Sequence, residues 1–196
     1  MIEIYLANQL KEVSLAMFRK SFFGIFHGSI SARAEYDRFI INKRDAIFDG
    51  LNLSDLIELY SKKDYRWNEA SQDAHIHLNI YKHIPESKFV CYAMPPYTSA
   101  YALTHAVIVP KDYFGSMMLG ALNVYDPRQF EDWYERADVE IYRYMKENKT
   151  NIMTIKGYGV YAYGRDIYQI AKHIAVLENS CKLLYLSSGH EAGILH

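Results

Sequence analysis

Two residues one helical turn apart, Asp73 and His77, have side chains of the types that transfer protons in enzymes. A carboxylate and an imidazole four residues apart lie on the same face of a helix, where they can form a hydrogen-bonded pair. This spacing predicts a general acid–base site with Asp73 and His77 as its catalytic residues. It also suits an acidic residue held at a helix N-terminus by the helix dipole, followed by a buried histidine without a chemical role. The sequence leaves both interpretations open.

A helix and a strand between Ser71 and Pro96 position this pair. The helix has an apolar stripe and a polar stripe: Ile76, Ile80 and Ile84 on the first, and Asp73, His77 and Tyr81 on the second. A turn at Pro85 leads to a β-branched and aromatic strand at residues 88–94, which a double proline ends. This segment is therefore the predicted centre of the fold.

Helices and strands alternate through the rest of the chain. Helical spacing of apolar residues marks residues 3–21 and a last helix from Asp166. Further helices are predicted at residues 55–60 after an N-cap at Ser54, at residues 97–105, and from Asp126-Pro127 onward. Strands are predicted at residues 25–33, in a hairpin of residues 37–41 and 46–48, and at residues 106–109, 121–125, 152–156 and 160–163. This irregular mixture indicates an α/β fold with a largely antiparallel central sheet.

Composition limits the classes of partner. The chain has 196 residues, 50% of them hydrophobic, which predicts one domain over residues 1–196. Its 22 Lys and Arg residues balance 23 Asp and Glu residues, so we expect no nucleic-acid or membrane-surface partner. Cys91 and Cys181 fall in predicted buried elements, and no secretory leader or spanning apolar run is recognisable. A cytoplasmic protein without structural disulfides is expected.

Short motifs occur in a fixed order at Gly28–Arg33, at Ser71-Gln72-Asp73, at His77 and at Ile80-Tyr81. Over about residues 6–188 they resemble the class II aldolase/adducin family. The corresponding family patterns are Gly-Asn-x-Ser-x-Arg and Ser-Ser-Glu, followed by His and Ile-Tyr. The resemblance implies a three-layer αβα fold with a largely antiparallel central sheet. It also implies a homotetramer with clefts between subunits, and the 18 tyrosines suit such interfaces.

The zinc ligands of the family's enzymes are replaced in this chain. The family's His-x-His falls on Tyr92 and Met94, and its Asn-His-Gly falls on the segment containing Tyr158. Neutral phenols and a thioether are poor zinc ligands. His75 and His77 could share one ion on a strand, but the stripes favour a helix, on which residues two apart point to nearly opposite sides. We therefore expect no cofactor, and zinc only if the chain is an active enzyme with an unrecognised metal site.

The phosphate cradle of the family has counterparts here. The resemblance places the ligand-binding positions at Gly28, Ser29, Asn42, Lys43, Arg44, Ser71 and Gln72. Backbone amides, hydroxyl donors and a helix N-terminus can bind an anion without a metal. The alternative is an ordinary surface turn with solvated charges.

Two functions follow from these observations. The first is a divergent aldolase/adducin-family pseudoenzyme that binds a phosphorylated sugar-like ligand or a protein partner, without zinc-dependent aldolase activity. The second is an active sugar-phosphate aldolase or epimerase, a carbon–carbon lyase that uses Asp73 as its acid/base. The zinc positions distinguish the two.

Overall fold

The central sheet fixes the position of every other element. The computed structural model describes residues 3–25 and 27–191. The strands are β1 (Ser29–Glu35), β2 (Arg38–Asn42), β3 (Leu56–Tyr60), β4 (Phe89–Ala93), β5 (Val107–Ile108), β6 (Leu122–Tyr125), β7 (Ile152–Ile155) and β8 (Gly159–Gly164). In this part of the chain they form one eight-stranded sheet in the order β3-β2-β1-β4-β8-β7-β6-β5. Only β6 and β7 pair in parallel among these described strands. The predicted α/β class and largely antiparallel sheet are confirmed.

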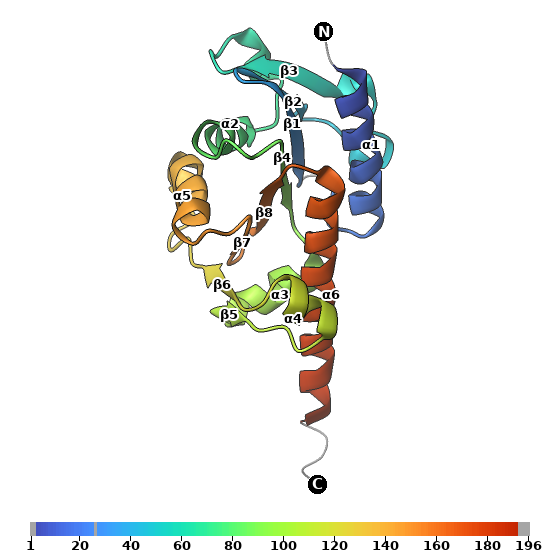
Figure 1. The fold of residues 1–196 in the computed structure, drawn as a ribbon, viewed down its shortest axis with the longest axis vertical. Coiled ribbons are helices and arrows are strands. Elements are labelled where there is room, and N and C mark those ends of the chain that lie inside the picture. The colour runs from blue at the N-terminus through green and yellow to red at the C-terminus, as the bar shows by residue number, and fades with distance from the viewer. Residues whose placement is uncertain (1–2, 26, 192–196) are drawn as a thin grey trace.

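Helices cover both faces of the sheet (Figure 1). They are α1 (Ile4–Arg19), α2 (Ala74–His83), α3 (Pro96–Thr104), α4 (Tyr113–Met118), α5 (Trp133–Glu147) and α6 (Ile167–Glu191). Helices α2 and α5 lie together on one face, and α1 and α6 lie on the other. None of the helices in the described ranges is long and apolar enough to cross a membrane. Cys91 and Cys181 are buried free thiols.

Strand alternation separates two cores. Ile30, Cys91 and Val160 point toward α1 and α6, whereas Val90 and Tyr161 point toward α2 and α5. The register aligns Ser29 of β1 with Tyr92 of β4, and Tyr92 with Tyr161 of β8. A row of polar and aromatic side chains therefore crosses the sheet beneath α2.

Two predicted elements near the first hairpin are wrong. Residues 55–60 are predicted as a helix, but residues 56–60 form β3, which pairs with β2 from Arg38↔Tyr60 to Asn42↔Leu56. Cross-strand pairing and burial thus override the weak helical spacing. The hairpin joins β1 to β2 rather than residues 37–41 to 46–48, and Phe48 begins a short 3-10 helix, Phe48–Gly50.

The helix predicted from Asp126-Pro127 begins later, at Trp133. Asp126 instead accepts a hydrogen bond from the backbone N–H of Arg128 at 2.8 Å, and Arg128 has a φ of 65°. A residue in the left-handed region cannot continue an α-helix, so the chain turns here before α5 starts. The last helix follows its predicted pattern: Ile167, Ile170, Ile174, Leu177, Cys181 and Leu184 are all buried.

Gly159 provides a test of how tightly β8 is held against β4. Its φ is 145°, and an added Cβ would lie 2.5 Å from the Ala93 carbonyl oxygen. We expect Gly159→Ala to lower the free energy of unfolding by more than about 1 kcal/mol, because the backbone is strained and the neighbour is main chain. Gly50→Ala is the control, since nothing lies within 4 Å of its added Cβ. Urea unfolding measures both, and equal stabilities would contradict the packing described.

Candidate active site

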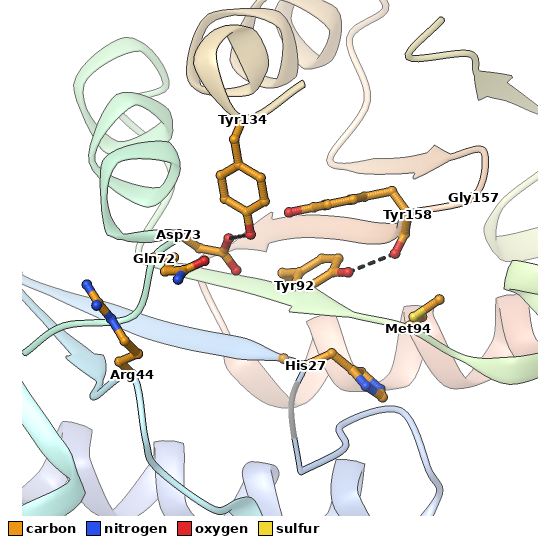
Figure 2. Close-up of a pocket in the computed structure, with 10 residues that line it drawn as sticks. His27, Arg44, Gln72, Asp73, Tyr92, Met94, Tyr134, Gly157 and Tyr158 are labelled. Atoms are coloured by element: carbon orange, nitrogen blue, oxygen red, sulfur yellow. Dashed lines mark hydrogen bonds between the residues drawn. The ribbon is translucent and has the colours of Figure 1, made fainter. Parts of the chain in front are cut away.

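Asp73 is a buried carboxyl group just before α2. Its side chain is 4% exposed and accepts hydrogen bonds from two distant elements. The Ser29 hydroxyl of β1 donates to Oδ2 at 2.7 Å. The Tyr134 hydroxyl of α5 donates to Oδ1 at 3.0 Å, as Figure 2 shows. Both carboxyl oxygens are therefore hydrogen-bonded, as a buried polar group requires.

A chain of hydrogen bonds continues behind Asp73. His77 Nε2 lies 2.9 Å from the Ser29 Oγ, and His77 Nδ1 lies 2.6 Å from the Ser31 Oγ. The Ser31 Oγ lies 2.7 Å from the Tyr81 Oη. Since Ser29 uses its only proton on Asp73, it must accept one from His77 Nε2–H. A neutral His77 then accepts at Nδ1 from the Ser31 hydroxyl, and Ser31 accepts from the Tyr81 hydroxyl. Each group in the chain therefore donates its proton to the next group on the way to Asp73.

Burial shifts the pKa values of Asp73 and His77 in the directions that favour their neutral forms. Desolvation raises the pKa of Asp73, against the opposing effect of hydrogen bonds from Ser29 and Tyr134. Desolvation also lowers the pKa of His77 to about 3, with a smaller contribution from His75. His77 is therefore neutral across the physiological range. Its place behind Ser29 makes it a group that orients Asp73 rather than a second proton donor.

A cavity of about 360 Å³ opens beside Asp73. It is lined by His27, Gly28, Arg44, Gln72, Asp73, Tyr92, Met94, Tyr134, Gly157 and Tyr158. Figure 2 shows Tyr134 reaching down to Asp73 from one side, with Tyr92, Tyr158 and Met94 along another. The cavity thus joins a buried carboxyl to a wall of phenols.

The positions assigned to ligand binding from the sequence divide into two groups. Gly28, Arg44 and Gln72 line the cavity. The others, Ser29, Asn42, Lys43 and Ser71, do not. Ser29 bonds to Asp73, and Asn42 accepts from the Ile30 N–H at 2.9 Å and donates to the Lys43 carbonyl at 3.0 Å. The Ser71 hydroxyl accepts from the Asp73 N–H at 3.3 Å, and Lys43 pairs with Glu69 at 3.3 Å.

Comparison with known proteins assigns the chain to a family. The sequence profile of the Class II Aldolase and Adducin N-terminal domain matches residues 8–185. The chain is a member of this family. No curated protein sequence matches it.

Solved structures of class II aldolases share the fold. L-fuculose-1-phosphate aldolase from Thermus thermophilus matches with a TM-score of 0.86 and 19% identity over 97% of each chain. A sugar-phosphate aldolase from Thermotoga maritima has a TM-score of 0.71 and 14% identity, over 95% of this chain and 97% of that one. L-fuculose 1-phosphate aldolase from Glaciozyma antarctica PI12 has a TM-score of 0.73 and 17% identity, over 95% of this chain and 74% of that one. At these identities the likeness establishes the fold.

Tyr92, Met94 and Tyr158, which the resemblance places at the family's zinc positions, all line the cavity. The residues present do not suit zinc. The Tyr92 hydroxyl donates to the Tyr158 carbonyl at 2.7 Å, and burial raises the pKa of both phenols, which disfavours the phenolate form that would bind zinc best. In the described part of the chain, no three His, Cys, Asp or Glu side chains gather as a metal site would require.

Tyr134 is the site residue that the sequence did not indicate. It follows Trp133 in the first turn of α5, and the predicted start of that helix was several residues too early. Tyr81 lies on the predicted polar stripe and Ser31 within the Gly28–Arg33 motif, but the contacts of Ser31 with His77 and Tyr81 depend on the β1 register. No local pattern marks any of these three contacts, because each joins elements far apart in the sequence.

His77 should make folding stability depend on pH. Its pKa is about 3 when folded and 6.5 by its ordinary value, so between these pH values the unfolded chain binds a proton that the folded chain does not. The contribution of His77 to the free energy of unfolding is fully present above pH 6.5. It is lost as the pH falls toward 3, at up to about 1.4 kcal/mol per pH unit. The raised pKa of Asp73 acts in the opposite direction.

Comparing wild type with His77→Gln isolates the histidine contribution, since glutamine keeps a donor for Ser29 but does not titrate. Urea unfolding from pH 4 to 7 should show a shallower loss of stability in the variant. His83→Gln, at an exposed position near the end of the same helix, is the control. An identical pH slope in wild type and His77→Gln would show that His77 is not held neutral.

Proposed function

We propose that this chain is a divergent class II aldolase-family protein that binds a small phosphorylated, sugar-like ligand and has no zinc-dependent aldolase activity. It would retain a three-layer αβα fold as a single domain over residues 1–196. The observation that carries the proposal is the cavity beside Asp73. Phenols and a thioether line it at the positions that the resemblance assigns to zinc, and three of the residues expected to bind an anion, Gly28, Arg44 and Gln72, line it as well. Such a pocket can bind without the chemistry that zinc supplies.

Arg44 is the main support for an anionic ligand. It is exposed, lines the cavity and forms no ion pair with any residue in the described ranges. The other titratable groups at the cavity are biased toward their neutral forms, because burial lowers the pKa of His27 and raises that of Asp73. Gly28, with a φ of 121°, brings the backbone close to the cavity, and Gln72 stands just before the N-terminus of α2. A phosphate group suits this end.

The aromatic wall supports a polyhydroxylated ligand. Tyr92, Tyr134 and Tyr158 each combine an apolar ring with a hydroxyl group, which is a suitable surface for the alternating CH and OH groups of a sugar. A volume of about 360 Å³ accommodates a molecule of a few carbon atoms with a phosphate. The ligand class therefore follows from both ends of the cavity.

The second candidate is an active sugar-phosphate aldolase or epimerase with Asp73 as acid/base. One observation favours it: Asp73 is a buried carboxyl of raised pKa at the floor of a cavity, in contact with the Tyr134 hydroxyl. Turnover of a ketose 1-phosphate that persists in chelator and disappears in Asp73→Asn would establish it. A protein-interaction role remains the proposal if no phosphorylated compound binds.

We also propose a cytoplasmic homotetramer. Exposed apolar side chains support an interface between subunits: Tyr113, Phe114 and Met117 on α4, and Leu183 and Leu186 on α6. The C-terminal half of α6 extends beyond the sheet (Figure 1). Light scattering gives the mass, and a stable monomer at micromolar concentration would oppose the proposal.

Arg44→Gln should weaken binding of phosphate esters. Removing the unpaired guanidinium deletes a charge-assisted hydrogen bond, so we expect affinity for glycerol 3-phosphate to fall by about tenfold or more. Lys43→Gln is the matched control, because Lys43 is engaged with Glu69 outside the cavity. Isothermal titration measures both. Equal affinity in wild type and Arg44→Gln would show that the phosphate group does not bind at Arg44 in this cavity.

Purified protein should contain far less than one zinc per chain, because the groups at the family positions are not zinc ligands. Elemental analysis after expression in zinc-supplemented medium measures the content. As a positive control, the triple variant Tyr92→His, Met94→His and Tyr158→His restores the family's ligands and should bind zinc. About one zinc per wild-type chain would refute the proposed metal-free pocket.

A further inference from the structure

Tyr158 occupies the third zinc position and is rigidly held. It lies in the turn between β7 and β8, flanked by Gly157 with a φ of 69° and Gly159 with a φ of 145°. Its backbone N–H donates to the Ile155 carbonyl at 3.1 Å, and its carbonyl accepts the Tyr92 hydroxyl at 2.7 Å. The backbone at Tyr158 is therefore held on both sides of the residue.

Aromatic contacts fix the Tyr158 ring as well. It stacks on Tyr92 with ring centroids 4.9 Å apart and lies parallel to Tyr161 at 6.3 Å. Trp133 and Tyr134 meet it edge-on at 5.8 and 6.1 Å. Packing from four sides leaves the ring little freedom, so its hydroxyl is preorganised.

This hydroxyl is buried without a hydrogen bond of ordinary geometry. The Tyr158 Oη has no such partner in the described part of the chain, and neither does the Tyr161 Oη beside it. Each hydroxyl has only a weak, poorly aligned contact with a polar neighbour: the contact from Tyr161 lowers the pKa of Asp73, and the contact from Tyr158 lowers that of Tyr134. An unpaired buried hydroxyl costs about 1–3 kcal/mol, so it is expected to gain a partner on binding.

The unpaired hydroxyl points toward the reactive end of the cavity. Figure 2 shows the Tyr158 ring extending toward the Asp73 carboxyl and the Tyr134 hydroxyl. Burial, and to a smaller extent the Asp73 charge, raises the pKa of Tyr158. The phenol therefore keeps its proton and can donate a hydrogen bond. The Tyr92 hydroxyl, in contrast, is already committed to the Tyr158 carbonyl.

We propose that the Tyr158 hydroxyl donates a hydrogen bond to a carbonyl oxygen of the ligand, at the pole of the cavity where family enzymes hold zinc. The inference rests on the proposed function, which places the phosphate of the same ligand near Arg44. A fixed, neutral phenol in a poorly solvated site binds a carbonyl oxygen more strongly than a hydroxyl group of the same skeleton, because the carbonyl offers acceptors only. The ligand class is a phosphorylated ketone or aldehyde.

Dihydroxyacetone phosphate and glycerol 3-phosphate test this, because they differ at the central carbon, which is a carbonyl in one and a hydroxyl-bearing carbon in the other. In wild type, isothermal titration should show about three- to tenfold tighter binding of the ketone. Tyr158→Phe should bring the ratio close to one while leaving glycerol 3-phosphate affinity almost unchanged. Tyr163→Phe, on β8 but outside this cavity, should keep the wild-type ratio.

The outcomes separate the two proposals. A ketone preference that persists in Tyr158→Phe overturns the role of Tyr158, and binding without any preference does the same while leaving the anion site intact. If neither phosphate ester binds, the proposed function fails. Dihydroxyacetone and glycerol then serve as phosphate-free probes by saturation-transfer NMR. A dihydroxyacetone signal lost in Tyr158→Phe supports the donor, and an unchanged or absent signal overturns it.

Stability gives an independent readout. Because the Tyr158 hydroxyl has no protein partner of ordinary geometry, Tyr158→Phe should leave the Tm of the free protein unchanged or raise it. Tyr134→Phe, which removes a hydrogen bond to Asp73, should lower it. A Tm for Tyr158→Phe several degrees below wild type would show that the hydroxyl already has a partner and would overturn the premise.

Discussion

The buried carboxyl of Asp73 is the constraint on which the rest of the site depends. A carboxyl group removed from water must have its oxygens hydrogen-bonded, and here the donors come from β1 and α5. Ser29 and Tyr134 therefore fix the distance from the sheet to both helices of this face. Asp73, held at the start of α2, lines the cavity together with Arg44 and Gln72.

At the positions that the resemblance assigns to zinc, this chain has aromatic side chains that contact one another. Tyr92 and Tyr158 bond and stack with each other, and Tyr161 extends the stack into the core. These interactions stabilise β4 against β8 by packing and hydrogen bonding, whereas a metal ion would do so by coordination. The Tyr158 hydroxyl, which has no partner of ordinary geometry in the described part of the chain, is the group that we propose donates to a ligand.

The segments with strong periodicity could be predicted from the sequence, and the contacts across the sheet could not. Helix α2 and strand β4 agree with the pattern of Ser71–Pro96, and Asp73 and His77 do share one helical face. The sequence predicts that Ser29 faces a ligand, but its hydroxyl donates to Asp73 instead. The reason is the register of β1, which pairing with β4 sets. Tyr134 could not be identified, since the turn at Arg128 that delays α5 depends on a local φ that no composition signal marks.

The tautomer of His77 is the most direct test, because the Nε2–H form is expected only if Ser29 donates its proton to Asp73 and accepts one from His77. Two-dimensional NMR of 15N-labelled histidine ring nitrogens reports it. We expect a neutral ring with the proton on Nε2 from pH 5 to 8. A proton on Nδ1, or a ring that becomes charged near pH 6.5, would contradict it.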